Sequence, residues 1–233
     1  MLDRSLLIRY TDKSEFEIMT REESRARNAL EKVSNKCRKQ VGKSFGWKQC
    51  DYLNWKIESG YYFSLCHLVL EQVELSVKPY FIDDLWWDIF EMPENKKAPK
   101  SLRGNGTYAV SGIDIKKYVV FDRDKIPVYT EEDVIARWED TFSAIEADIA
   151  QFISENPNPD LFCPLGRTSR IYELMMDIQA GHLDQALEKI ELFKANPNGV
   201  IYSGPKGYDY EYIERWCKKM MYIYLSLSKN GGK

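Results

Sequence analysis

The sequence predicts an α+β protein: a mostly antiparallel sheet covered by helices, with a C-terminal helical hairpin plus one helix. Three observations lead to this class. Residues 45–80 show the alternation of adjacent strands, long amphipathic helical patterns precede and follow the strand region, and the chain after residue 158 is mainly helical. Because strands are grouped and helices are grouped, the pattern favours α+β over an alternating α/β fold.

Composition excludes several classes of function. The 233 residues are 44% hydrophobic and 30% charged, which provides enough apolar material for a packed core. The formal net charge of −3 gives no overall bias toward nucleic acid or anionic membranes. The sequence contains no run of about 18 apolar residues, so no membrane span is predicted. We therefore expect neither a nucleic-acid partner nor a membrane.

The cysteines indicate a reducing compartment. All five are scattered along the chain, and no two have the spacing of metal ligands. We interpret them as reduced thiols, which predicts a cytoplasmic protein. Neither a cofactor nor a metal is expected, because the sequence contains no phosphate loop, nucleophile elbow or zinc-protease helix.

A first helix is predicted to begin after Thr20, because Glu23 stands three residues on and completes a capping box. Its apolar positions recur every three or four residues as far as Val41, which marks one buried stripe. The other face is basic, since residues 21–43 contain eight Lys or Arg and three Glu. Before this helix, residues 6–8 could form a short edge strand.

The strand region forms the centre of the predicted sheet. Residues 61–70 are apolar on both faces, which is typical of a buried central strand. Residues 73–78 alternate, with Lys78 among the polar positions, and this pattern suits a half-exposed strand. Ser59-Gly60 is turn-like, whereas Glu71-Gln72 is poor hairpin chemistry, so residues 60–78 could be two strands or one long bent strand.

The region after Pro79 is predicted to leave the sheet. Asp83 or Asp84 could cap a short helix, and residues 93–106 form a loop that ends in a turn at residues 105–106. Two further strands are then expected at residues 107–110 and 117–121.

The longest helix is predicted to begin after Thr130, with Asp133 in capping position, and to end before Pro157. Its outer face is acidic, since residues 131–155 contain eight Asp or Glu. We place the domain boundary at its end. This division gives a sheet domain at residues 1–158 and a helical C-terminal subdomain at residues 159–233 packed on it.

The helical hairpin carries a resemblance. Gly181-His182-Leu183-Asp184-Gln185-Ala186-Leu187, with a proline after the second helix, resembles the inter-helix turn of a tetratricopeptide repeat. Phe193 stands where that family has a small residue, and there is no second copy, so we interpret the segment as a lone hairpin using the same turn. The remainder resembles uncharacterised bacterial α+β proteins that carry a domain of unknown function. Some of these are suspected immunity partners of secreted toxins.

Acidic and aromatic residues are densest in the short helix after the strands. Asp84 and Asp88 are four residues apart on one helical face, so they could hold a divalent cation or act as acid and base. The adjacent Trp86 and Trp87 could line a ligand, although core and rim positions are commoner for such a pair. Arg103, in a basic glycine-containing loop, could contact an anion. We interpret the segment as an amphipathic turn with an acidic outer face; if the protein has a small-molecule cleft, the cleft is predicted to lie between this helix and that loop.

The leading hypothesis is a non-catalytic, cytoplasmic bacterial protein that binds a protein partner, with an immunity-type inhibitor as its most specific form. It depends on the lack of a catalytic signature, the many aromatic residues and the two oppositely charged helices. No catalytic residue is assigned, because the only histidines, His67 and His182, fall in an apolar strand and a helix turn. The alternative is a hydrolase or small-ligand binder that uses residues 83–91. A third option, a scaffold, requires an open groove beside Tyr172 and Leu183. The oligomeric state stays open.

Overall fold

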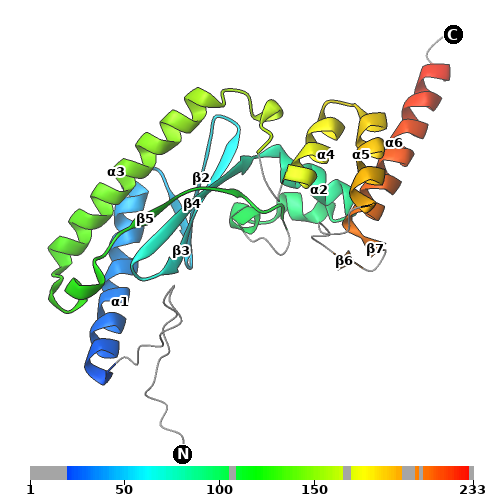
Figure 1. Cartoon of the computed structure of the whole chain (residues 1–233). Coiled ribbons are helices and arrows are strands. Elements are labelled where there is room, and N and C mark those ends of the chain that lie inside the picture. Colours follow the sequence, from blue (N-terminus) through cyan, green and yellow to red (C-terminus); the bar gives the residue numbers. More distant parts are fainter. Residues whose placement is uncertain (1–19, 105–108, 165–168, 196–202, 205–206, 231–233) are drawn as a thin grey trace, which may run out of the picture. The chain divides into compact units, whose positions relative to one another are not determined.

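The computed structural model describes residues 20–104, 109–164, 169–195, 203–204 and 207–230 (Figure 1). Five strands form one antiparallel sheet in the order β1-β2-β3-β4-β5, accompanied by helices. The predicted α+β class is therefore confirmed. The expected edge strand at residues 6–8 and the turn at residues 105–106 lie outside the described residues.

The chain divides into two compact units, each made of three segments. Unit 1 comprises Met1–Lys56, Ser64–Ser76 and Asp114–Phe152, and unit 2 comprises Ile57–Phe63, Val77–Ile113 and Ile153–Lys233. Because the strands contribute residues to both units, no single cut in the sequence separates them. The boundary predicted at residue 158 lies shortly after the last change of unit.

Unit 1 contains the long helix α1 (Arg21–Ser44) and all but the last three residues of the long helix α3 (Glu131–Glu155). The predicted capping box of α1 is confirmed: the Glu23 N–H donates to Thr20 Oγ1 at 3.2 Å, and the Thr20 N–H donates to Glu23 Oε2 at 2.8 Å. At α3, the Asp133 N–H donates to Thr130 Oγ1 at 3.1 Å. Each cap satisfies N–H groups that the first helical turn leaves without partners.

The two helices pack on each other through α1's buried side. Trp138 Nε1 of α3 donates to Ser34 Oγ of α1 at 3.1 Å, and both side chains are buried. At Gly42 the contact is tight, because an added Cβ would lie 2.9 Å from Phe142 Cζ. Glycine at this position therefore permits the packing.

The sheet consists of β1 (Lys48–Cys50), β2 (Leu53–Glu58), β3 (Tyr61–Val69), β4 (Gln72–Pro79) and β5 (Ile113–Val119). Strand β3 is central, as predicted, and its residues Tyr61, Tyr62 and Phe63 are all fully buried. The turn between β2 and β3 is also as predicted: Ser59 and Gly60 have φ of 48° and 80°. Positive φ at both turn residues matches the twist of a two-residue hairpin.

Residues 60–78 form two strands, not one bent strand, with the turn at Leu70 and Glu71. Contacts distant in sequence stabilise this turn. The Glu71 carbonyl accepts the N–H groups of Val120 and Phe121, and the Glu71 carboxylate pairs with Arg27. These interactions replace the glycine or asparagine that a tight turn usually contains.

The prediction of a strand at residues 107–110 is wrong for residues 109 and 110, the two that the structure describes. Ala109 and Val110 are not in a strand, and the next strand, β5, begins at Ile113, earlier than predicted. Val110 instead donates its N–H to Asp83 Oδ1 at 3.1 Å and accepts from Lys78 Nζ at 2.6 Å. The N–H and carbonyl of Val110 are thus hydrogen-bonded to side chains and are not available for pairing with a neighbouring strand.

Unit 2 contains α2 (Phe81–Ile89), α4 (Ser169–Gln179), α5 (Leu183–Lys194) and α6 (Asp209–Asn230). The predicted hairpin is α4 and α5, and Gly181 between them has a φ of 78°, which favours glycine. Shorter elements of unit 2 are the 3₁₀ turns Pro93–Lys97, Lys100–Gly104 and Pro159–Leu161 and the unpredicted strand pair β6 (Ser203–Gly204) and β7 (Gly207–Tyr208); unit 1 has the 3₁₀ turn Arg123–Val128.

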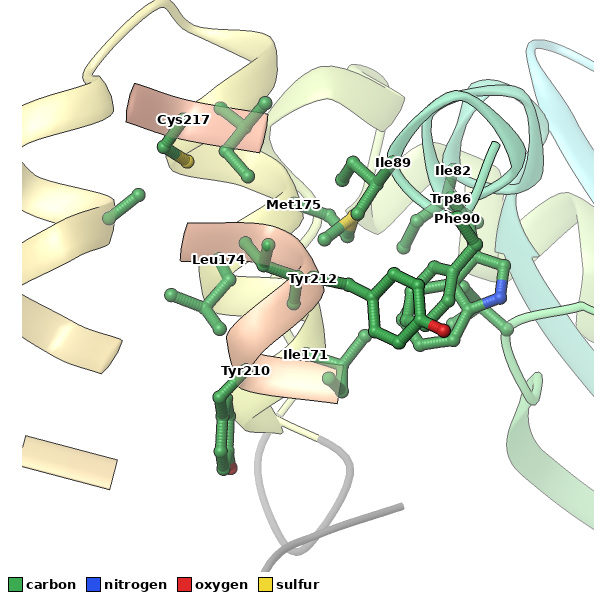
Figure 2. Packing of buried hydrophobic residues seen from close by; sticks show 14 of the residues in the cluster. Ile82, Trp86, Ile89, Phe90, Ile171, Leu174, Met175, Tyr210, Tyr212 and Cys217 are labelled. Atoms are coloured by element: carbon green, nitrogen blue, oxygen red, sulfur yellow. The ribbon is translucent and has the colours of Figure 1, made fainter. Parts of the chain in front are cut away.

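Helices α2, α4, α5 and α6 share one apolar core. Figure 2 shows side chains from α2, α4 and α6 that meet there, among them Ile89, Met175 and Tyr212. No helix in the part of the chain that the structure describes is long and apolar enough to span a membrane.

Candidate functional site

Helix α2 follows β4 directly, at Tyr80, and carries most of the predicted site residues. The prediction that Asp83 or Asp84 caps this helix is wrong. The helix begins at Phe81, and the N-cap residue before it, Tyr80, makes no side-chain capping bond. Both aspartates lie inside the first turn, where negative charge is favourable. Asp83 is directed to a buried partner instead of a backbone N–H of the first turn.

That partner is Lys78, at the end of β4. Lys78 Nζ donates to Asp83 Oδ1 at 2.8 Å, to the Val110 carbonyl at 2.6 Å and to the Arg103 carbonyl. The sequence pattern placed Lys78 on the exposed side of its strand, and this is wrong, because it is buried with all three donors used. Burial lowers the pKa of Lys78 and raises the pKa of Asp83, since each charge has lost its hydration.

Arg103 connects the same region to Asp84. Its guanidinium lies against the rings of Tyr80 and Trp87, with Cζ 4.0 Å and 4.8 Å from their centroids. It donates to the Tyr80 carbonyl at 2.8 Å and to Asp84 Oδ1 at 2.6 Å. The Arg103 side chain is buried, so its charge is used within unit 2 to hold the 3₁₀ turn Lys100–Gly104 on α2.

Asp88 has a different partner. Lys96 Nζ lies 2.6 Å from the Asp88 carboxylate, and both side chains are partly exposed. Asp84 and Asp88 are thus one helical turn apart, but they pair with different cationic side chains, Asp84 with Arg103 and Asp88 with Lys96. Among the described residues, no group of three or more His, Cys, Asp or Glu is arranged to hold a metal ion.

The two tryptophans are buried in different surroundings. Trp86 packs on Phe90, with centroids 4.1 Å apart, and Phe90 stacks on Tyr212 at 4.5 Å (Figure 2). Trp87 is in contact with Arg103. The structure therefore joins Asp84, Trp87 and Arg103, and it places Trp86 in the apolar core and Asp88 with Lys96.

Sequence reasoning missed the central members of this network, Lys78 and Tyr80. Lys78 looked like an ordinary solvent-facing strand residue. A faint signal exists, because its strand ends in a proline and is followed five positions later by Asp83 in an apolar helix. A lysine and an aspartate in an otherwise apolar stretch are seldom buried unless they pair.

Other titratable groups are also bound into the fold. His67 lies in β3, with Nε2 3.3 Å from the Leu70 carbonyl, and burial together with the Arg38 charge lowers its pKa. All five cysteines are free thiols. Tyr172 and Leu183, expected to flank a groove in the scaffold hypothesis, are buried in the core, which gives that option no support.

The most exposed apolar residues of unit 2 include the end of α6. Tyr222, Tyr224, Leu225 and Leu227 have exposed fractions of 75%, 51%, 62% and 62%. In Figure 1, α6 continues past the ends of α4 and α5 of the same unit. We call these four residues the α6 apolar end.

Comparison with models of protein families, with curated proteins and with solved structures finds no match.

Proposed function

We propose that this chain is a non-catalytic, cytoplasmic bacterial protein that binds another protein, most specifically as an immunity-type inhibitor. The observation that carries the proposal is the α6 apolar end. Its four large side chains are more than half exposed and lie within six consecutive residues. Large apolar side chains exposed together at one end of a helix mark an interaction surface.

The positions of these residues suggest the kind of contact. At about 100° per residue, Tyr222 and Leu225 lie on one side of the helix, and Tyr224 and Leu227 lie on another. A flat surface could cover only one of these sides. A partner with an apolar groove that encloses the helix end would cover both, which is the helix-in-groove mode of recognition.

The predicted site supports a non-catalytic function. Three charged residues of this region are buried, and Asp83 forms ion pairs with both Lys78 and Arg103. These charges therefore stabilise unit 2 and are not accessible to a substrate. The small-ligand alternative retains Asp84 and Asp88, whose carboxylates are partly exposed. Its test is thermal stabilisation by a divalent cation that is lost in Asp84→Asn/Asp88→Asn.

The proposal is tested by affinity capture from the native host with three proteins. These are the wild type, the variant Leu225→Glu/Leu227→Glu, and the control Leu161→Glu/Leu192→Glu. The control leucines are somewhat more exposed, at 78% and 69% against 62% for each α6 leucine, and the change in charge is the same. We expect one partner to be retained by the wild type and control and lost by the α6 variant.

The captured protein must then be purified and shown to bind directly and to lose its toxic activity in the presence of the wild type. Co-expression should relieve growth inhibition with the wild type and control but not with the α6 variant. The proposal fails if no partner depends on the α6 apolar end, or if size-exclusion chromatography shows that the surface only joins two copies of this chain.

A further inference from the structure

Helix α1 carries a row of basic side chains directly opposite its buried side. The exposed basic residues of the helix are Arg21, Arg25, Lys32, Lys36, Lys39 and Lys43. At about 100° and 1.5 Å per residue, they fall within an arc of about 60° and extend over about 33 Å. We call these six residues the basic ridge.

The other two basic residues of α1 differ from the ridge residues, because they are bound within unit 1. Arg27 pairs with Glu71, and Arg38 is buried and donates to the carbonyls of Asp51 and Tyr52. These two side chains stabilise unit 1. The ridge residues lie on the opposite, exposed side of the helix and are not buried in unit 1.

Acidic partners along the ridge are few. Lys36 pairs with Glu131 of α3, at 2.7 Å, and both side chains are exposed. For Arg25, Lys32, Lys39 and Lys43, the described part of the chain supplies no ion pair. Their mutual repulsion is a cost that an anionic partner would remove.

We propose that the basic ridge binds an acidic α-helical segment of a protein partner. The ridge is one side chain wide, and its residues recur at intervals of three or four, or about 5–6 Å along the axis, with one gap of seven residues between Arg25 and Lys32. Carboxylates at i, i+4 and i+7 on a second helix repeat at the same interval. Exposed pairs contribute little individually, but a complementary row sets the orientation and accelerates association.

A nucleic acid fits the same surface less well. Helix α3 lies beside α1, and its first turn exposes Glu131, Glu132 and Asp133, which would repel the phosphates of a broad duplex. No aromatic residue lies in the ridge to stack on bases. A narrow acidic helix avoids both difficulties. The inference rests on the proposed protein-binding function and adds a surface that is separate from the α6 apolar end.

The test uses the full chain and a defined probe, because the partner is unidentified. The probe is a fluorescent alanine-rich helical peptide of about 25 residues, the length of the ridge, with glutamates at i, i+4 and i+7. Its counterpart has glutamine at those positions. Fluorescence anisotropy compares the wild type with Lys32→Glu/Lys39→Glu and with the control Lys97→Glu/Lys219→Glu. The control lysines are exposed, and both variants change the net charge equally.

We expect the wild type and control to bind the glutamate peptide and not the glutamine peptide, with affinity that falls as salt is raised. The ridge variant should lose at least about tenfold in affinity, with unchanged circular dichroism and thermal unfolding. Three results would overturn the inference: no binding of the glutamate peptide at low salt, an equal loss in the control, or tighter binding of duplex DNA of the same length. None of these results affects the outcome of the affinity capture with the α6 variant. Failure of the proposal for the basic ridge is therefore distinguishable from failure of the proposed function.

Discussion

Lys78 and Asp83 form a buried ion pair at the junction of β4 and α2, with Lys78 Nζ 2.8 Å from Asp83 Oδ1. The two side chains are 2% and 0% exposed. Removing two charges from water is costly, and the hydrogen bonds to Val110 and Arg103 offset part of that cost. The pair therefore fixes the position of the Val110 backbone, since Asp83 accepts its N–H and Lys78 donates to its carbonyl.

Breaking the pair on one side should be strongly destabilising. Lys78→Met leaves Asp83 buried without its main partner, so we expect a loss of about 3–5 kcal/mol in the free energy of unfolding. The double variant Lys78→Met/Asp83→Leu should lose less than the sum of the single variants, because no charge remains uncompensated. Urea unfolding of the four proteins measures the coupling. Additive losses would show that the two side chains act independently.

Acid should weaken the turn between β3 and β4 through Glu71. Burial alone would raise the pKa of Glu71, but hydrogen bonds and charge from Arg27 outweigh it and hold the pKa below its ordinary 4.5. A carboxyl with a depressed folded-state pKa contributes stability that is present above about pH 4.5 and is lost as the pH falls through the lower folded value. Glu71→Gln should cost about 1–3 kcal/mol at pH 7.

Thermal unfolding of this variant between about pH 5 and pH 3 should also show a shallower decline than that of the wild type. Glu94→Gln is the matched control, because Glu94 is exposed and unfolding should change little. A decline as steep in Glu71→Gln as in the wild type would contradict the assignment.

Gly42→Ala should destabilise the protein although alanine favours helices. Helix propensity gains about 1 kcal/mol. The added Cβ would lie 2.9 Å from Phe142 Cζ, and that ring is fully buried and stacked on Phe45. Because the ring cannot move freely, overpacking should outweigh propensity and give a net loss of about 1–2 kcal/mol.

Two further variants check this reason. Gly42→Ala/Phe142→Leu should be less destabilised than the two single changes predict, since the smaller side chain makes room. Asn28→Ala, at an exposed position of the same helix, should be neutral or slightly stabilising. If Gly42→Ala melts above the wild type, α1 and α3 are not in such close contact.

His67 should make stability depend on pH just below neutrality. Burial and the Arg38 charge lower its pKa from 6.5, so the folded chain binds this proton more weakly than the unfolded chain. The contribution of neutral His67 to the free energy of unfolding is fully present above about pH 6.5. It decreases as the pH falls, by at most about 1.4 kcal/mol per pH unit. His67→Gln should remove this decrease in urea unfolding between pH 7 and about pH 5.5, and His182→Gln should keep it. An unchanged slope in His67→Gln would refute the assignment.

The candidate site was predictable only in its outline. The expectation that the loop of Arg103 lies beside the short helix agrees with the bond from Arg103 to Asp84. What the sequence could not show is that Arg103 lies against the rings of Tyr80 and Trp87 and that Lys78 is buried and donates to the Arg103 carbonyl. Burial of a charge depends on which segments close over it, and those segments lie 25 to 32 residues away.

The sequence by itself determined the α+β class and the elements whose signals are local. The capping residues Thr20 and Thr130 and the turn residues Ser59 and Gly60 act on neighbours within a few positions, so their effect can be read along the chain. Only the tertiary structure decided the turn at Glu71, the missing strand at Val110 and the burial of Lys78. In each case a hydrogen bond or ion pair from a distant segment competes with local propensity, and a buried polar group takes whichever partner the folded chain brings to it.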